Sequence, residues 1–162
     1  MNAVHKISLL ATMLATVGTQ ALAAGSAQVS YLHPEKFSDA GFGSFERNRT
    51  LRSLTEHFEV MAKRLPDGQV LRVEVLDIDL AGEIWPRTPS EVRVLRGRAD
   101  WPHLNLRYTV LDGSRTVKTG EIHLADMNYL FGQRIDQRYG DLPYEKRMLD
   151  RWFNEEIAPT SP

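Results

Sequence analysis

The sequence predicts an α+β domain, in which an antiparallel sheet of about five strands carries two main amphipathic helices packed on one face. Three observations predict this class. Apolar residues recur at helical spacing in two segments, alternating strands lie between them, and a turn signal joins two of these strands. Helices that flank a run of hairpin-connected strands are typical of the α+β architecture.

The first helix is expected at residues 45–64. Ser44 is placed to cap its N-terminus, and Glu46 lies in its first turn, where an acidic side chain is favourable. The segment LPDG at residues 65–68 combines proline and glycine and ends the helix. The apolar stripe that would face the sheet consists of Leu51, Leu54, Phe58, Met61 and Leu65.

The second helix is expected at residues 143–157. Pro143 suits the first turn, because its missing N–H has no helical partner there. Its apolar face consists of Met148, Leu149, Trp152, Phe153 and Ile157.

Five strands are expected, at residues 28–32, 70–81, 91–96, 103–111 and 116–124. The second of them changes phase. Leu71, Val73 and Val75 share one face of the strand. With strict alternation, Asp77 and Asp79 would continue on that same face. Side chains of a strand alternate strictly, so the change predicts a β-bulge or a sheet that is covered on both faces.

The segment DGS at residues 112–114 predicts a hairpin between the last two strands. An odd-length loop, such as three residues with Gly113 at positive φ, keeps the apolar residues of both strands on one face. This register places His103 opposite His123.

The first 23 residues have the pattern of a cleavable signal peptide. Lys6 precedes an apolar run at residues 7–17, and Ala21 and Ala23 have the spacing that signal peptidase recognises. The run is shorter than the roughly 20 residues that a membrane-spanning helix needs. We therefore expect cleavage after Ala23, an exported protein with one domain at residues 24–157, and a frayed tail at residues 158–162.

The composition narrows the classes of partner. The chain has no cysteine, which excludes disulfides, a thiol redox motif and the lipid-anchored cysteine of a lipoprotein. Its formal net charge is −1, so it offers no broad basic surface for nucleic acid. No apolar run beyond the signal peptide could span a membrane. A soluble exported domain is expected, with an envelope protein or another cell-envelope component as its partner.

Several segments together resemble a known family. They are HPEKFSD at 33–39, RLPDGQ at 64–69, VEVLDIDLAGE at 73–83, DWP at 100–102, LRYT at 106–109, YEKRML at 144–149 and WF at 152–153. In this order they resemble an uncharacterised family of small exported bacterial proteins, a domain of unknown function. The resemblance implies a single domain in the periplasm of a Gram-negative bacterium. It implies no catalytic residue.

Asp77, Asp79 and Glu83 form the first candidate site. Two carboxylates on one strand face beside a bulge could bind a hard divalent cation or act as acid and base. The alternative is that they face solvent or pair with arginines of neighbouring strands.

His103, Glu121 and His123 form the second candidate site. Imidazoles combined with a carboxylate suit zinc or another transition metal, provided that the hairpin register is as expected. Otherwise they are polar residues of an exposed sheet face.

Phe42, Trp85 and Trp101 are candidates for a ligand or partner surface, and the tryptophans alternatively close the ends of the core. No phosphate-binding loop, nucleophile elbow or zinc-protease motif is present. The sequence therefore favours a binding or accessory module without a resident cofactor. The alternative is a small metal-assisted hydrolase that uses either set of candidate ligands.

Overall fold

The computed structural model describes residues 24–85, 92–131 and 136–158. The signal peptide expected at residues 1–23 lies outside the described residues, as do residues 159–162 of the expected tail. The strands are β1 (Ser26–Tyr31), β2 (Gln69–Asp79), β3 (Glu83–Trp85), β4 (Val92–Val94), β5 (His103–Asp112) and β6 (Arg115–Ala125). The helices are α1 (Gly43–Ala62) and α2 (Pro143–Trp152), with 3-10 turns at Pro34–Lys36 and Gln137–Tyr139 and a π-helical turn at Phe153–Ile157.

The main sheet has four strands in the order β1-β2-β5-β6. Strand β1 runs parallel to β2, and the other neighbours are antiparallel. The α+β class is confirmed, but the main sheet is mixed and has one strand fewer than the five expected. The strand expected at residues 91–96 is β4, which pairs with β3 in a separate two-stranded sheet.

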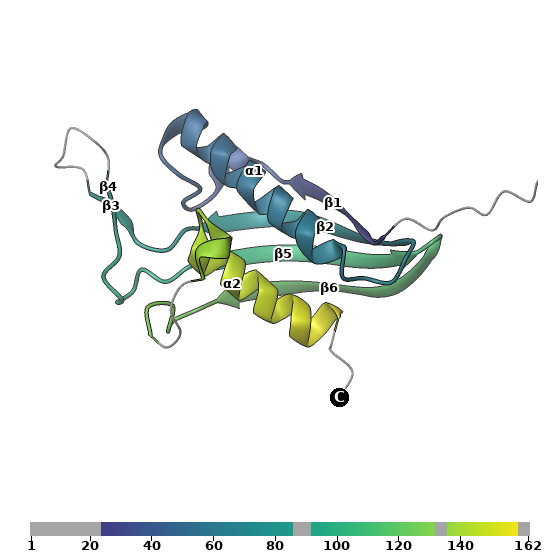
Figure 1. The fold of residues 1–162 in the computed structure, drawn as a ribbon. Helices are drawn as coiled ribbons and strands as arrows, with labels where there is room; N and C mark the ends of the chain where they lie inside the picture. Colours follow the sequence, from purple (N-terminus) through teal and green to yellow (C-terminus); the bar gives the residue numbers. More distant parts are fainter. Residues whose placement is uncertain (1–23, 86–91, 132–135, 159–162) are drawn as a thin grey trace, which may run out of the picture.

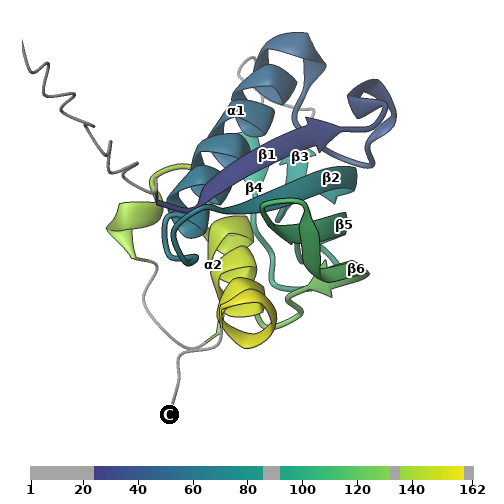
Figure 2. The same ribbon diagram turned by 90° about the vertical axis from the view of Figure 1, so that its right-hand side faces the viewer.

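Both helices cover the same face of the main sheet (Figures 1 and 2). Helix α1 lies over the β1–β2 side and α2 over the β5–β6 side, while the β3–β4 pair extends beyond one end of the sheet (Figure 1). The core fills the space between the helices and the sheet, and Leu54, Phe58, Leu106 and Leu149 are completely buried in it. No described helix has the combination of length and apolar character that crossing a membrane requires.

Helix α1 carries the predicted apolar stripe. Leu54, Phe58, Met61 and Leu65 are buried, and Leu51 packs against them. The helix begins earlier than expected, so the prediction that Ser44 caps it is wrong. Phe42 takes the N-cap position, and the Glu46 carboxylate accepts its backbone N–H at 2.8 Å. Glu46 thereby satisfies an N–H at the start of the helix.

The phase change in β2 is a β-bulge, which is one of the two alternatives that the sequence left open. The pairing with β5 shifts between Val75 and Asp77, which leaves Leu76 without a partner. Ile78 therefore returns to the buried face, while Asp77 and Asp79 lie on the face opposite the helices.

The register of the β5–β6 hairpin differs from the prediction. His103 lies opposite Ala125, and Asn105 lies opposite His123, so the expected pairing is wrong by two residues. The loop has two residues, with Gly113 at φ 61°, and the odd residue is Val117, which a bulge leaves unpaired. Since a shift of two residues preserves the face, His103 and His123 remain on the same side of the sheet.

Candidate functional site

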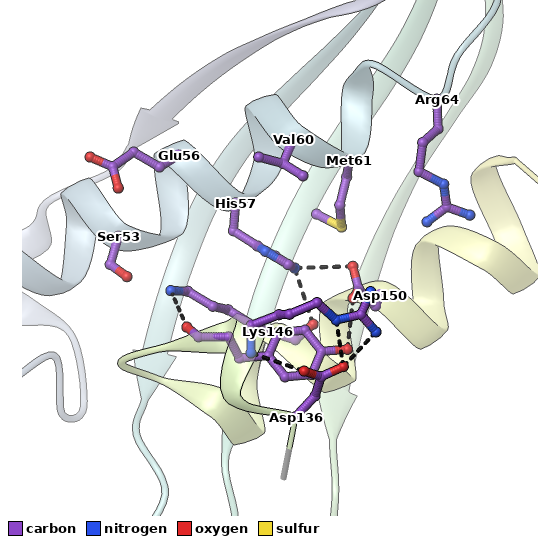
Figure 3. Close-up of a pocket in the computed structure, with 11 residues that line it drawn as sticks. Ser53, Glu56, His57, Val60, Met61, Arg64, Asp136, Lys146 and Asp150 are labelled. Atoms are coloured by element: carbon purple, nitrogen blue, oxygen red, sulfur yellow. Dashed lines mark hydrogen bonds and ion pairs between the residues drawn. The ribbon is translucent and has the colours of Figure 1, made fainter.

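A groove of about 400 Å³ lies between α1 and the segment that leads into α2 (Figure 3). One wall is formed by α1 and the turn that follows it, and it contributes Ser53, Glu56, His57, Val60, Met61 and Arg64. The other wall contributes Asp136, Arg138, Tyr139, Lys146 and Asp150. Two amphipathic helices packed side by side on a sheet leave such a groove where their apolar stripes give way to polar residues.

His57 and Asp150 join the two walls. The Nε2 atom of His57 is 3.1 Å from Asp150 Oδ1 and 3.2 Å from the carbonyl oxygen of Lys146. Both partners are acceptors, so Nε2 carries the hydrogen and Nδ1 keeps a lone pair when the ring is neutral. Tyr139 donates its hydroxyl to Asp150 Oδ2 at 2.8 Å and packs edge-on against the His57 ring.

Lys146 and Asp141 make a second connection. Lys146 Nζ donates to the carbonyl oxygen of Tyr139 at 2.9 Å and to Asp141 Oδ1 at 3.0 Å. Ser53 of α1 donates its hydroxyl to the same Asp141 oxygen at 2.6 Å. The groove is thus bounded by hydrogen bonds between side chains that are far apart in the sequence.

The environment sets the charges of these groups. Burial, and then the hydrogen bond to the Asp150 carboxylate, raise the pKa of Tyr139 to about 12. Burial alone raises the pKa of Asp150, but the hydrogen bonds from His57 and Tyr139 outweigh it and lower that pKa below its usual value. Asp141 has a lowered pKa for a similar reason, since Ser53 and Lys146 outweigh its burial. At neutral pH Asp150 and Asp141 are therefore carboxylates, and Tyr139 is a neutral phenol.

The groove can offer hydrogen bonds of both kinds to a ligand. Lys146 has three N–H donors, two of which are used within the described residues, and the neutral His57 ring has an acceptor at Nδ1. The Ser53 hydroxyl hydrogen is engaged by Asp141, so it is not donated to His57 as the hydroxyl of a nucleophilic serine would be. The arrangement is suited to hydrogen-bonded binding.

The first predicted carboxylate site is divided between two sheets. Asp77 accepts the backbone N–H of Ser38 at 2.8 Å and its hydroxyl at 2.7 Å, and so fixes the loop before α1. Asp79 Oδ2 lies 3.5 Å from His103 Nδ1. Glu83 lies on β3, with its carboxylate 3.8 Å from Arg96. The structure therefore places Asp77 and Asp79 on one face without Glu83.

The second predicted site is only partly assembled. The rings of His103 and His123 lie side by side, with centroids 5.3 Å apart. Glu121 instead accepts a hydrogen bond from Arg107 at 3.1 Å. Among the residues that the structure describes, no group of three or more His, Cys, Asp or Glu side chains is arranged to hold a metal ion.

The three predicted aromatic residues have different neighbours. Phe42 is exposed at the start of α1. Trp85 on β3 carries the guanidinium of Arg96 over its ring at 4.8 Å. Trp101 packs edge-on against His103 at 5.8 Å. A shared ligand or partner surface for these residues stays a prediction.

The residues of the groove were missed from the sequence. A signal for them existed, because His57 adjoins the apolar stripe of one predicted helix, and Lys146 and Asp150 are four residues apart on the other. The helical pattern alone does not show which flanks of the two helices face each other.

The fold and the groove define a small α+β protein with two helices on one face of a mixed sheet and a polar groove between them. The chain belongs to a family described as protein of unknown function (DUF3016), whose model matches residues 25–155. This confirms the resemblance to an uncharacterised family. No curated protein and no solved structure was found to match the chain.

Proposed function

We propose that this protein is a periplasmic binding module that holds a small polar molecule of low net charge in the groove between α1 and α2. One observation carries the proposal: hydrogen-bond donors and acceptors, including acidic and basic side chains, surround a cavity of about 400 Å³. Cavities of this size are typical of sites for small molecules.

The charge pairs within the groove support a ligand of low net charge. His57 faces Asp150, Lys146 faces Asp141, and Arg138 donates to Asp136 at 2.7 Å. Because Lys146 and Arg138 already face carboxylates and Asp150 already accepts a hydrogen bond from His57, a strongly charged ligand would have to compete with the internal pairs. A neutral or zwitterionic molecule can use the remaining donors and acceptors without breaking them.

The periplasmic location is supported by the signal-peptide pattern of residues 1–23. Expression of the full chain in a Gram-negative host tests it by fractionation and N-terminal sequencing. We expect the protein in the periplasmic fraction with Ala24 as its first residue. A cytoplasmic protein that keeps residues 1–23 would contradict the proposed location.

Binding is tested by NMR titration with a fixed panel of neutral sugars, zwitterionic amino acids and dipeptides. We expect at least one member to shift the amide signals of His57, Lys146 and Asp150. Val60 lines the groove and is 57% exposed, so Val60→Trp fills the groove without disturbing the core and should abolish the shifts.

The matched control is Val117→Trp, which adds the same side chain at a valine of β6 that is 50% exposed. It should bind as the wild type does, and thermal unfolding should show that both variants are folded. The proposal fails if no panel member shifts the groove signals, or if Val60→Trp binds like Val117→Trp.

A further inference from the structure

Two histidines lie together on the sheet face opposite the helices. His103 on β5 and His123 on β6 have ring centroids 5.3 Å apart and ring planes at 29°. His103 is partly exposed and His123 is exposed. This pair is on a different face of the sheet from the groove, so a role for it is independent of the proposed function.

A hydrogen-bond acceptor faces the Nδ1 atom of each ring. Asp79 Oδ2 lies 3.5 Å from Nδ1 of His103, and the side-chain oxygen of Asn105 bonds Nδ1 of His123. An acceptor at this position holds the hydrogen on Nδ1 and leaves the lone pair of Nε2 free. Histidines that bind metals are commonly oriented in this way by a carboxylate or a carbonyl group behind the ring.

The separation of the rings suits a shared ion. With bonds of about 2.0–2.1 Å from the metal to Nε2, two imidazoles on one tetrahedral ion have centroids roughly 5 Å apart. The observed 5.3 Å is close to this value.

Neighbouring carboxylates are engaged elsewhere. Arg107 holds Glu121 at 3.1 Å, and Ser38 bonds both oxygens of Asp77. The protein therefore offers two nitrogen ligands at this place and leaves further coordination positions to water or to a ligand from solution. Imidazole ligands favour zinc, copper and nickel over magnesium and calcium.

We propose that His103 and His123 bind one divalent transition-metal ion through their Nε2 atoms, with Asp79 and Asn105 orienting the two rings. The remaining coordination positions are open, so the site is able to accept a small ligand. Because this site is separate from the groove, we expect substitutions in the groove to leave metal binding unchanged.

The test is isothermal titration of Zn²⁺ into untagged, chelator-treated protein, with Mg²⁺ as the comparison ion. We expect one Zn²⁺ per chain and no Mg²⁺ binding. His103→Ala and His123→Ala should each abolish measurable Zn²⁺ binding, because each leaves one protein ligand. Asp79→Asn should weaken it by about tenfold, since it removes the carboxylate behind His103.

Two controls separate this site from others. His33 lies after the end of β1 and has an exposed ring, so His33→Asn should bind Zn²⁺ as the wild type does. Val60→Trp, which fills the groove, should also leave Zn²⁺ binding unchanged. This result separates metal binding at the histidines from ligand binding in the groove. Thermal unfolding in chelator should show that all the variants are folded.

A second readout needs no metal. Long-range ¹⁵N–¹H spectra of the metal-free protein should show the Nδ1–H tautomer for both histidines. The proposal is overturned if wild-type protein binds no Zn²⁺, if His103→Ala or His123→Ala binds it normally, or if His33→Asn abolishes binding. The opposite tautomer at both rings would refute the proposed roles of Asp79 and Asn105.

Discussion

Glu145 provides a test of how the buried face of α2 is held. Its side chain is 2% exposed, and its Oε1 atom accepts the backbone N–H of Ala81 at 2.8 Å. Ala81 is also 2% exposed, and it lies where the chain leaves β2 for β3. Glu145→Ala removes the acceptor and leaves a buried N–H without its partner, which should cost about 1–3 kcal/mol of unfolding free energy.

Glu145→Gln keeps an acceptor oxygen and removes the charge. Burial raises the pKa of Glu145 above its usual value, although the hydrogen bond from Ala81 opposes this. The stabilising contribution of the protonated carboxyl is therefore complete below the pKa of the unfolded chain and is lost as the pH rises through the folded pKa. The stability of Glu145→Gln relative to wild type should increase with pH.

Urea unfolding at about pH 4 and about pH 8 measures both effects. A loss of about 2 kcal/mol in Glu145→Ala moves the urea midpoint by about 1 M when the slope is about 2 kcal/mol/M. Subtracting wild-type values removes the contributions of the other carboxylates, which titrate in both proteins. The reasoning is refuted if Glu145→Gln is as unstable as Glu145→Ala at both pH values, or if its difference from wild type does not grow with pH.

Three further predictions concern other polar groups. Trp152 Nε1 has no hydrogen-bond partner among the described residues, so Trp152→Phe should change the unfolding free energy by less than about 1.5 kcal/mol, whereas Trp152→Ala should cost about 3–5 kcal/mol in thermal or urea unfolding. Asp150 and Asp141 have lowered pKa values, so their stabilisation is present above the unfolded pKa and is lost as the pH falls through the folded one; a double Asp→Asn variant should show a flatter acid-unfolding curve than wild type. Tyr31 donates its hydroxyl to Leu51 O at 2.7 Å, and burial raises its pKa to about 12; Tyr31→Phe should therefore cost about 1 kcal/mol in urea unfolding and remove one phenol that titrates near that pH in ultraviolet absorbance. The argument for Trp152 is contradicted if Trp152→Phe is strongly destabilised. The argument for the aspartates is contradicted if the acid-unfolding curve is unchanged, and that for Tyr31 if Tyr31→Phe does not change the stability.

Local pattern was sufficient for both helices, for five of the six strands that the structure describes, and for one irregularity. The stripe that includes Leu54 and Phe58 identified α1 and its buried face, because a helix repeats every 3.6 residues. The change of phase at Leu76 identified the bulge in β2, because side chains of a strand alternate strictly. Gly113 marked the hairpin turn through its positive φ.

Which strands pair, and in which register, could be learned only from the tertiary structure. The parallel β1–β2 pair joins Ser26 to Val70, and the partner of β4 is β3 and not the main sheet. The hairpin register depends on a bulge at Val117 that no local signal marks. Each of these outcomes is selected by packing against distant residues, which periodicity does not encode.

The histidine pair and the groove differ in the same way: local pattern predicted the first, and only the tertiary structure shows the second. From the sequence alone, His103 and His123 were placed on one face of a hairpin, since an error of two residues in the register preserves the face. The groove depends on His57 meeting Asp150, residues on two different helices. The sequence determined the apolar face of each helix, because that is a property of local spacing. The tertiary structure decided which elements meet, because contacts between distant segments depend on the packing of the whole core.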